Sequence, residues 1–468
     1  MKTTDGDYDI AIIGGGVSGT ALLYTLARYS DVKRLVLLEK CAAFGQINSN
    51  ARNNSQTLHV GDIETNYGIE KVKQVKPAAL MVARYAQNLP DDIRSKILFQ
   101  TPKMILAVGE QETRELADRY EKIKSIFPNI RKLDREGIAR TEPLIVAGRD
   151  PAEKILALYT EDGYAVDYER LAQSFVHEVK RQEKDAGRDI DVQTGARVVG
   201  IDRADSLYTV AFEDGRKIAA CVVVMNADAY SLLFAKRLGY GKEFSLIPVA
   251  GSFYFSKQLL RGKVYTMQNP RLPFAAVHGD PDVRVADMTR WGPTARFFPV
   301  LEARNLKTMR DYFRVSGLHR WKTWMSFFTI LLEPIRALYL FQNFLYEMPA
   351  IGTRLFARQV RKIVPSVRAR DLSYAKGFGG MRLQRVNTDT RELLLGEGKI
   401  IGDNIIFNMT PSPGASVCLY NALRDAEAIA KFFPSGEYRF DKERMMRDLC
   451  EEPPAAMEDT SLKDTYAS

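Results

Sequence analysis

The stretch YDIAIIGGGVSGTALLYTLARY, residues 8–29, contains the pattern that decides the fold. It begins with a short apolar run typical of a buried strand, passes through glycines, and continues with apolar residues at helical spacing. Gly14, Gly16 and Gly19 form a GxGxxG motif within it. In this motif the first glycine permits a tight turn, the second lets a pyrophosphate approach the backbone, and the third lets the helix pack on the strand. The N-terminus of the helix supplies positive partial charge for the phosphates.

A second strand follows in RLVLLEK, residues 34–40, and ends at Glu39, twenty residues after Gly19. A carboxylate at this place can bind ribose hydroxyls. Strand, glycine turn, helix and strand together predict an α/β, Rossmann-like dinucleotide-binding domain. At this point both NAD and FAD are candidate cofactors.

Two later segments favour FAD. Residues 48–67, NSNARNNSQTLHVGDIETNY, form a polar stretch that contains His59 and suits a binding loop. Residues 404–433 begin as an apolar strand, turn at Pro and Gly, and continue as an amphipathic helix whose N-terminus lies near Gly414, Ala415 and Ser416. A second helix end of this kind can stabilise a negatively charged flavin ring.

Composition limits the class of protein. At 468 residues the chain is too long for one core, so we expect two domains. Hydrophobic residues at 46% and charged residues at 27% exclude a disordered protein and a polytopic membrane protein. The net charge of +9 is compatible with nucleic acid, anionic lipid or an acidic metabolite as partner.

Cysteine usage and targeting signals indicate a reducing cytoplasm. The four cysteines are far apart and form no CxxC pair, which predicts neither a disulfide framework nor a metal site. The N-terminal residues do not form a secretory signal. The most hydrophobic window, residues 325–346, is interrupted by Glu333, Pro334 and Arg336, and we expect that it does not cross a bilayer.

The predicted elements divide the chain into two discontinuous domains. Residues 157–182 are typical of a strand, a turn and a helix, and residues 217–230 of a strand that ends at Asn226, so both join the nucleotide-binding sheet in this interpretation. Residues 248–255 and 263–268 have strand-like composition. The predicted ranges are 1–79, 155–235 and 371–440 for the FAD-binding domain, 80–154 and 236–370 for a substrate and membrane-facing domain, and 451–468 for a flexible tail.

Taken together, GGGVSG, Glu39, the SN…NNSQTLH loop, PVAGSFYF, PFAAVHGDPD, GFGGMR and NMTPSPGAS closely resemble malate:quinone oxidoreductase, from about residue 7 to about residue 435. This family lies in the flavoprotein superfamily that contains D-amino-acid oxidase and L-2-hydroxyglutarate dehydrogenase. The resemblance implies a Rossmann-like FAD-binding domain with a mixed α+β substrate domain over the flavin. It also implies an enzyme, peripheral to the cytoplasmic membrane, that oxidises (S)-malate to oxaloacetate and passes two electrons to quinone.

The resemblance also implies roles for individual residues. Residues that match the adenine-dinucleotide positions are Gly14, Gly16, Gly19 and Glu39; those that match the flavin-side loop are Asn54, Ser55, Thr57 and His59; those that match the helix end beneath the flavin are Gly414, Ala415 and Ser416. The family's active-site positions fall on His278 and Arg382. The stretch from 48 to 59 fits a shorter variant of the family, so substrate contacts of the longer enzymes need not transfer.

Alcohol oxidation through a flavin requires a base for the hydroxyl proton, and imidazole suits neutral pH. Of the four histidines, His177 and His319 have the surroundings of surface or packing residues. His59 is predicted to donate or accept a hydrogen bond with the cofactor, and His278 is predicted to be the general base. The choice between them depends on which imidazole faces the substrate.

A dicarboxylate substrate requires cations, because the planar arginine fork binds carboxylates in bidentate geometry. Arg382 follows glycines that allow a close approach and is the predicted ligand of one carboxylate. Arg261, Lys263 and Arg290 are weaker candidates for the second.

Residues 304–322 contain six basic residues and one acidic residue, and Trp321, Trp324, Phe327 and Phe328 lie among or just beyond them. This composition predicts a peripheral contact with an anionic membrane through residues from about 304 to 346. A packed helix with a solvated basic face is the alternative.

Two other functions stay open at this point. One is FAD-dependent oxidation of another 2-hydroxy acid, such as L-2-hydroxyglutarate, and the other is a flavin-binding protein without turnover. Nucleic-acid binding is not expected, because no recognised motif for it is present.

Overall fold

The pattern at residues 8–40 folds as predicted. The computed structural model describes all residues except 1–6, 183–186, 270–271, 273–275, 349–350, 395, 411–412, 451–464 and 467–468. β1 (Tyr8–Ile13) leads into α1 (Val17–Tyr29) and then β2 (Arg34–Leu38). The two strands pair in parallel, with Ile12 opposite Leu37. Both are largely buried, as expected for parallel strands covered by helices on both faces.

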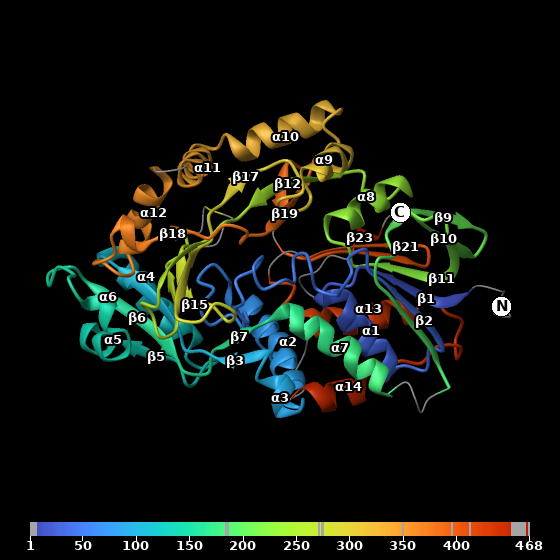
Figure 1. Ribbon diagram of the computed structural model, residues 1–468, viewed down its shortest axis with the longest axis horizontal. Helices are drawn as coiled ribbons and strands as arrows, with labels where there is room; N and C mark the ends of the chain where they lie inside the picture. Colours follow the sequence, from blue (N-terminus) through green and yellow to red (C-terminus); the bar gives the residue numbers. More distant parts are fainter. Residues whose placement is uncertain are drawn as a thin grey trace.

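These strands belong to a nine-stranded sheet (Figure 1). Its strands, in spatial order, are β23 (Thr465–Tyr466), β21 (Gly398–Gly402), β22 (Ile405–Met409), β11 (Lys217–Met225), β1, β2 and β8 (Asp189–Gln193), with β10 (Leu207–Phe212) paired to β11 and β9 (Val198–Ala204) paired to β10. The five strands from β22 to β8 are parallel. The carboxyl ends of β1, β2 and β11 therefore meet at one edge, where a doubly wound sheet binds its ligand.

Two groups of helices cover this sheet. On one face, the core is formed with α1, α2 (Ile69–Gln87), α7 (Tyr168–Gln182), α13 (Cys418–Ala430) and α14 (Lys442–Leu449). On the other face lie α8 (Ala229–Arg237) and α9 (Met309–Ser316). Figure 1 shows the two groups below and above the sheet.

The rest of the chain builds a second part around two further sheets. An eight-stranded sheet has the order β18 (Ser373–Tyr374), β13 (Tyr254–Lys257), β16 (Met288–Gly292), β15 (His278–Pro281), β14 (Lys263–Thr266), β4 (Lys103–Val108), β6 (Ile155–Thr160) and β5 (Arg131–Leu133). A four-stranded sheet has the order β17 (Arg296–Phe297), β12 (Phe244–Ala250), β19 (Met381–Asn387) and β20 (Glu392–Leu394).

Smaller elements complete this part. Helices that pack on the eight-stranded sheet are α4 (Glu110–Ile123), α5 (Arg135–Thr141), α6 (Pro143–Val146) and α12 (Ile351–Arg361). Strands β3 (Leu98–Gln100) and β7 (Tyr164–Val166) form a separate two-stranded sheet. The short helix α3 (Asp91–Arg94) precedes β3 in the chain. The strands predicted at 248–255 and 263–268 are confirmed as β12, β13 and β14.

The sheets divide the chain differently from the predicted ranges at three places. β6 pairs with β4 and β5, so it lies in the eight-stranded sheet and not in the nucleotide-binding one. β19 pairs with β12 in the four-stranded sheet. α2 crosses the expected boundary at residue 79 and packs with α13 and α14 on the nucleotide-binding side.

The predicted tail at 451–468 falls mostly outside the described residues. Its described part is β23, which pairs with β21.

The basic and aromatic region is helical. After a 3₁₀ turn (Leu306–Thr308) and α9, the chain forms α10 (Trp321–Leu331) and α11 (Pro334–Tyr346). Among the described residues, no single helix has both the length and the apolar composition to span a membrane, and α10 with α11 meets these criteria only as a pair bent by 84°.

Candidate functional site

The glycine turn after β1 opens onto a cavity lined by residues from both parts of the molecule. Gly14 has φ of +111°, and a Cβ there would lie 2.4 Å from the Asn226 carbonyl oxygen. A Cβ on Gly19 would lie 1.9 Å from the Gly14 carbonyl oxygen, so both glycines are required by packing. Gly16 differs, because a Cβ there would meet only Ser49 Oγ, at 3.3 Å. The open space beside Gly16 is available to a group in the cavity.

Glu39 follows β2 at the edge of the same cavity. Its carboxylate accepts hydrogen bonds from the Gly15 and Cys41 amides, each at 2.7 Å. These bonds fix both carboxylate oxygens, and each oxygen keeps a further lone pair for a ligand hydroxyl.

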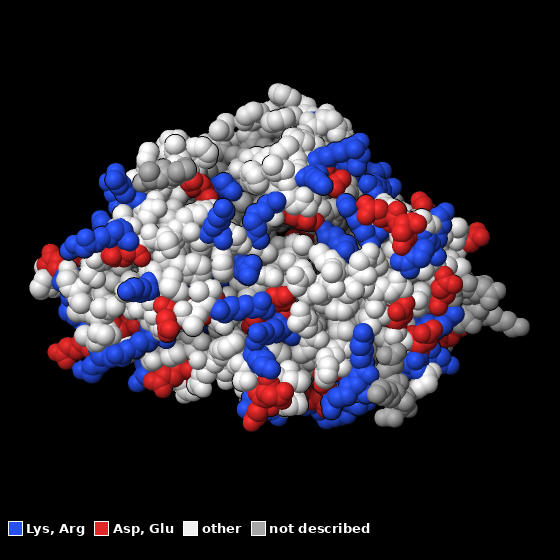
Figure 2. Space-filling view, in the orientation of Figure 1, with Lys and Arg blue, Asp and Glu red and all other residues white. Residues whose placement is uncertain are grey.

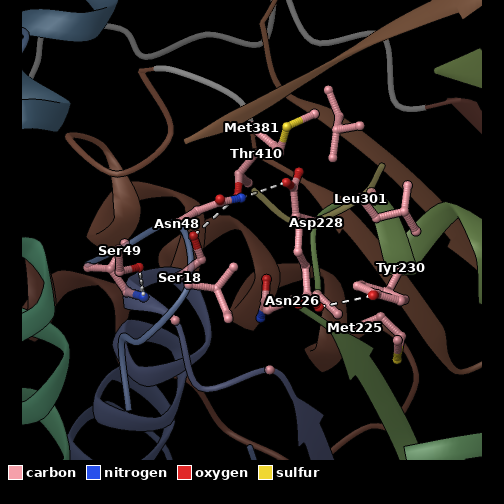
Figure 3. Close-up of a pocket in the computed structure, with 18 of the residues that line it drawn as sticks. Ser18, Asn48, Ser49, Met225, Asn226, Asp228, Tyr230, Leu301, Met381 and Thr410 are labelled. Atoms are coloured by element: carbon pink, nitrogen blue, oxygen red, sulfur yellow. Dashed lines mark hydrogen bonds between the residues drawn. The ribbon is translucent and has the colours of Figure 1, made fainter. Parts of the chain in front are cut away.

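The cavity has a volume of about 440 Å³, within the range typical of cofactor sites. Figure 3 shows Ser18 and Asn48 on one side, facing Asn226, Asp228 and Tyr230 on the other. The cavity extends from Gly14 and Glu39 at one end to other lining residues that include Asn54, Ser55, Thr57, His59, Arg382, Ala415 and Ser416.

These groups fit a dinucleotide cofactor. The space beside Gly16 and the N-terminus of α1 suit a pyrophosphate, and Glu39 suits a ribose. The three features lie on one cavity, as the sequence predicts.

The loop after Asn48 is held by its own side chains. Asn54 Nδ2 donates to the carbonyl oxygens of Asn48, Ser49 and Asn50, at 3.1, 3.2 and 2.9 Å. Asn54 therefore shapes the loop that lines the cavity. Thr57 makes a similar contribution further along, because its hydroxyl lies 2.7 Å from the hydroxyl of Tyr265.

His59 is the histidine that lines the cavity, with its side chain 15% exposed. Nδ1 donates a hydrogen bond to the Glu64 carboxylate, and Nε2 lies 3.2 Å from Ser55 Oγ. The His59 amide donates to Ser416 Oγ at 3.0 Å. Because the carboxylate can only accept, Nδ1 carries the proton in this contact and Nε2 presents a lone pair in the neutral ring.

The contact with His59 also changes the pKa of Glu64. Burial raises the pKa of its carboxyl, but the charge and hydrogen bond of His59 outweigh burial and lower the pKa below its ordinary value. A carboxylate that stays ionised beside Nδ1 stabilises the imidazolium form when Nε2 accepts a proton.

Arg382 lies at the start of β19 and lines the same cavity. Burial lowers the pKa of its guanidinium, and the neighbouring Tyr265, Tyr339 and Tyr67 act in the opposite direction. Within the described part of the chain, no carboxylate forms an ion pair with Arg382. A half-buried guanidinium that lines a cavity without a counter-ion is a candidate site for an anionic ligand.

A sequence model of the malate:quinone oxidoreductase family matches residues 6–438. The chain belongs to this family. The malate:quinone oxidoreductase of Helicobacter pylori is 41% identical over 453 residues, which cover 95% of this chain and 98% of that protein. The probable malate:quinone oxidoreductase of Campylobacter jejuni is 41% identical over 437 residues, covering 91% and 96% of the two chains. The family predicted from the motifs is confirmed.

Solved structures confirm the fold class. L-α-glycerophosphate oxidase from Mycoplasma pneumoniae, solved with FAD bound, superposes with a TM-score of 0.61 at 15% identity, over 93% of this chain and 97% of that one. Glycine oxidase from Geobacillus kaustophilus has a TM-score of 0.60 at 16% identity, over 96% and 100%. A mitochondrial L-2-hydroxyglutarate dehydrogenase from Dictyostelium discoideum is 26% identical over only 58% of this chain, so the alternative substrate is not favoured.

In this member of the malate:quinone oxidoreductase family, His278 does not line the cavity described above. It is 1% exposed and stacks on Tyr265, with 4.2 Å between ring centroids. Burial lowers the pKa of the imidazole to about 3, although Asp280 acts in the opposite direction. A histidine behind the cavity wall with so low a pKa is poorly placed to be the general base. His278, which the resemblance places in the active site, therefore does not face this cavity.

The weaker substrate candidates do not line the cavity either. Lys263 and Arg290 are fully buried, and both bind Asp280 Oδ2, at 3.0 and 3.1 Å. Arg261 lies at another surface, where its guanidinium reaches the carbonyls of Arg140 and Thr141 at 3.5 and 3.4 Å. None of the three lines the cavity, because each is committed to protein partners elsewhere.

The three predicted residues of the C-terminal segment differ in their relation to the cavity. Ala415 and Ser416 line the cavity just before α13, whereas Gly414 is buried behind them. Sequence reasoning missed Glu64 and Asp228. Glu64 follows His59 by five residues, and Asp228 follows the carboxyl end of β11, where ligand-binding residues are expected.

The Asp228 carboxyl is expected to make the stability of the protein depend on pH. It lines the cavity with φ of 51° and accepts a hydrogen bond from Asn48 Nδ2 at 2.9 Å, and burial raises the pKa of its carboxyl to about 6. Because the folded state favours the protonated form, its contribution to stability is lost as the pH rises through about 6. At about 1.4 kcal/mol per pKa unit, the loss is at most about 3 kcal/mol.

Asp228→Asn should remove this loss. Denaturant unfolding of cofactor-free protein at pH 4 and pH 8 measures it, with the wild type losing more stability than the variant. Equal losses in the two proteins would show that the Asp228 carboxyl is already ionised at pH 4 in the folded state.

Proposed function

We propose that this chain oxidises (S)-malate to oxaloacetate with FAD as its cofactor and passes the electrons to a membrane quinone. The observation that carries the proposal is that two groups with complementary chemistry line the same cavity. There, His59 backed by Glu64 offers a base, and Arg382, which has no carboxylate partner among the described residues, offers a cation. Membership of the malate:quinone oxidoreductase family supports malate as the substrate.

Gly16, the N-terminus of α1 and Glu39 would hold the dinucleotide part of FAD, and the loop from Asn54 to His59 with Ser416 would border the flavin end. When bound, FAD supplies the two-electron acceptor for alcohol oxidation.

Arg382 would bind a carboxylate of the substrate, because a planar fork with no carboxylate partner in the described part of the chain can form two hydrogen bonds to it. Its position on β19, paired with Val249 of β12, fixes the guanidinium from the four-stranded sheet. Burial away from water strengthens this contact.

His59 would take the hydroxyl proton at Nε2. Glu64 then faces an imidazolium through Nδ1 and stabilises the charge that the transfer creates. Oxidation releases two electrons and two protons from malate, and His59 accounts for the proton from the hydroxyl.

The test of the function is anaerobic reduction of the holoenzyme. Malate should bleach the flavin absorption band, and a soluble quinone should restore it. L-2-hydroxyglutarate, one carbon longer, should reduce the flavin at least about tenfold more slowly, because one methylene is worth about 1–3 kcal/mol of discrimination. No bleaching by malate, or faster bleaching by L-2-hydroxyglutarate, would overturn the assignment.

The base is tested by three histidine variants. His59→Gln should lower the rate of flavin reduction by malate about 10²-fold or more, the usual contribution of a positioned base. His177→Gln, at an exposed position on α7, is the matched control and should leave the rate unchanged. His278→Gln should have a smaller effect than His59→Gln. The opposite order would return the role of base to His278.

Contact with the membrane is proposed for α10 and α11. Their exposed apolar side chains recur at helical spacing and therefore lie on one face of each helix: Trp321, Trp324, Phe328 and Leu332 on α10 and just after it, and Leu338, Phe341 and Phe344 on α11. Figure 2 shows uncharged atoms over these helices at the top of the molecule, with Lys and Arg gathered beside them over α9. An apolar face beside basic residues is typical of an interfacial contact with anionic lipid.

The same helices lie close to the substrate end. Burial raises the pKa of Tyr339 on α11 to about 12, and the charge of Arg382 opposes this rise, so α11 lies within electrostatic range of the cavity-lining arginine. A quinone dissolved in lipid would have a short path to the flavin from this side.

A double variant tests this contact. Leu338→Glu/Phe341→Glu should reduce sedimentation with anionic phospholipid vesicles by about tenfold or more, since each buried apolar side chain contributes about 1.5–3 kcal/mol. Leu80→Glu, an exposed leucine on α2, is the control and should sediment like the wild type. Unchanged sedimentation of the double variant at low salt would exclude α11 as the membrane contact.

A further inference from the structure

Two lysines lie buried side by side beneath the loop that carries His59. Lys103 on β4 and Lys263 on β14 are paired across parallel strands, so both side chains project from the same face of the sheet. They are 1% and 0% exposed. Buried like charges at paired positions cost free energy, so specific partners must compensate each of them.

Lys263 connects an acidic partner to the loop. Its Nζ lies 3.0 Å from Asp280 Oδ2 and donates to the Ser55 carbonyl oxygen at 3.2 Å. Arg290 makes a parallel connection, since it binds Asp280 Oδ2 at 3.1 Å and donates to the Ala51 carbonyl oxygen at 3.2 Å. Two cations from the eight-stranded sheet thus hold two carbonyls of the loop.

Lys103 holds the next part of the same loop. Its Nζ lies 2.6 Å from Asp62 Oδ2 and 3.5 Å from the Leu58 carbonyl oxygen. Leu58 directly precedes His59, and Asp62 lies between His59 and its partner Glu64.

The cluster around Lys263 is electrically balanced. Lys263 and Arg290 face the carboxylates of Asp280 and Asp282, with Arg290 lying 3.2 Å from Asp282 Oδ2. His278 adds no compensating charge, because burial lowers the pKa of its imidazole to about 3. Removal of one cation would leave a buried carboxylate uncompensated and a buried carbonyl without its donor.

We propose that Lys263 and Lys103 are positioning residues, which fix the loop from Ala51 to Asp62 so that His59 faces the substrate and the loop borders the flavin. This inference rests on the proposed function only in that His59 is the group positioned for catalysis. The strands that carry the lysines are already joined by backbone hydrogen bonds, and the lysine side chains reach across to the loop.

The position of Arg382 determines how a displaced loop should affect kcat and KM. Arg382 lies on β19, in a different sheet from either lysine, so its guanidinium is positioned mainly by the four-stranded sheet, although the Gly379 amide just before it donates to the Arg52 carbonyl oxygen of the loop at 2.8 Å. Displacement of the loop should therefore lower kcat and leave KM nearly unchanged.

The experiment compares Lys263→Met with Arg149→Met in the holoenzyme. Arg149 is a matched control, because its buried guanidinium also donates to main-chain carbonyls, those of Ile145, Lys362 and Ile363, far from the cavity. Thermal denaturation measures the structural cost of each change. The flavin absorption spectrum and the Kd for FAD, from fluorescence quenching, measure the loop without any turnover.

Lys263→Met should shift the flavin spectrum, raise the Kd for FAD about tenfold and lower kcat with malate about tenfold, with KM changed less than about threefold. Arg149→Met should lower the melting temperature and leave the other quantities unchanged. A spectrum, Kd and kcat of Lys263→Met that match those of Arg149→Met would overturn the proposal.

If Lys263→Met does not yield folded protein, Asp280→Asn, which keeps the size of the side chain, is judged by the same criteria. Because the spectrum and the Kd for FAD require no substrate, a wild type that fails to oxidise malate would refute the proposed function and still leave the positioning role decided by these two measurements.

Discussion

The loop between Ala51 and Glu64 contains no helix or strand, so its buried carbonyl groups depend on donors from other elements. Arg290, Lys263 and Lys103 serve three of them, and Tyr168 on α7 donates to the Thr57 carbonyl oxygen at 2.8 Å. The irregular backbone allows the loop to line a cavity between two sheets. The donors restore the order that a regular element would have supplied.

The two parts of the molecule contribute different chemistry to one cavity. The nine-stranded sheet supplies backbone and helix ends through Gly16 and the N-terminus of α1, which suit phosphates. The other sheets supply charged side chains, among them Arg382 in the cavity and Lys263 behind its wall. A dinucleotide end and a substrate end therefore arise from separate sheets, and the loop with His59 joins them.

The sequence predicted the structural features that depend on residues close together in the chain. The β1–α1–β2 unit, the role of Gly14 and Gly19 in packing, and the polar loop with His59 depend on neighbours within a few residues, and they could be derived from spacing alone. His278 could not, because its burial depends on Tyr265 and on three paired strands that meet only in the folded chain. β6 was assigned to the wrong sheet for the same reason, since a short apolar run does not specify which strand it pairs with.

The cations of the site separate into two kinds, and this difference identifies the one kept for a ligand. Lys103, Lys263 and Arg290 are buried and each has a carboxylate within 3.2 Å. Arg382 is partly removed from water and has no carboxylate partner among the described residues. Its planar guanidinium is nevertheless the side chain best suited to bind a carboxylate through two hydrogen bonds. Among the described residues, these three cations are paired and Arg382 is not, which costs stability that an anionic substrate offsets when it binds. Proton transfer to His59 then adds a second positive charge to the cavity. The Glu64 carboxylate, which contacts Nδ1, compensates the charge of the resulting imidazolium.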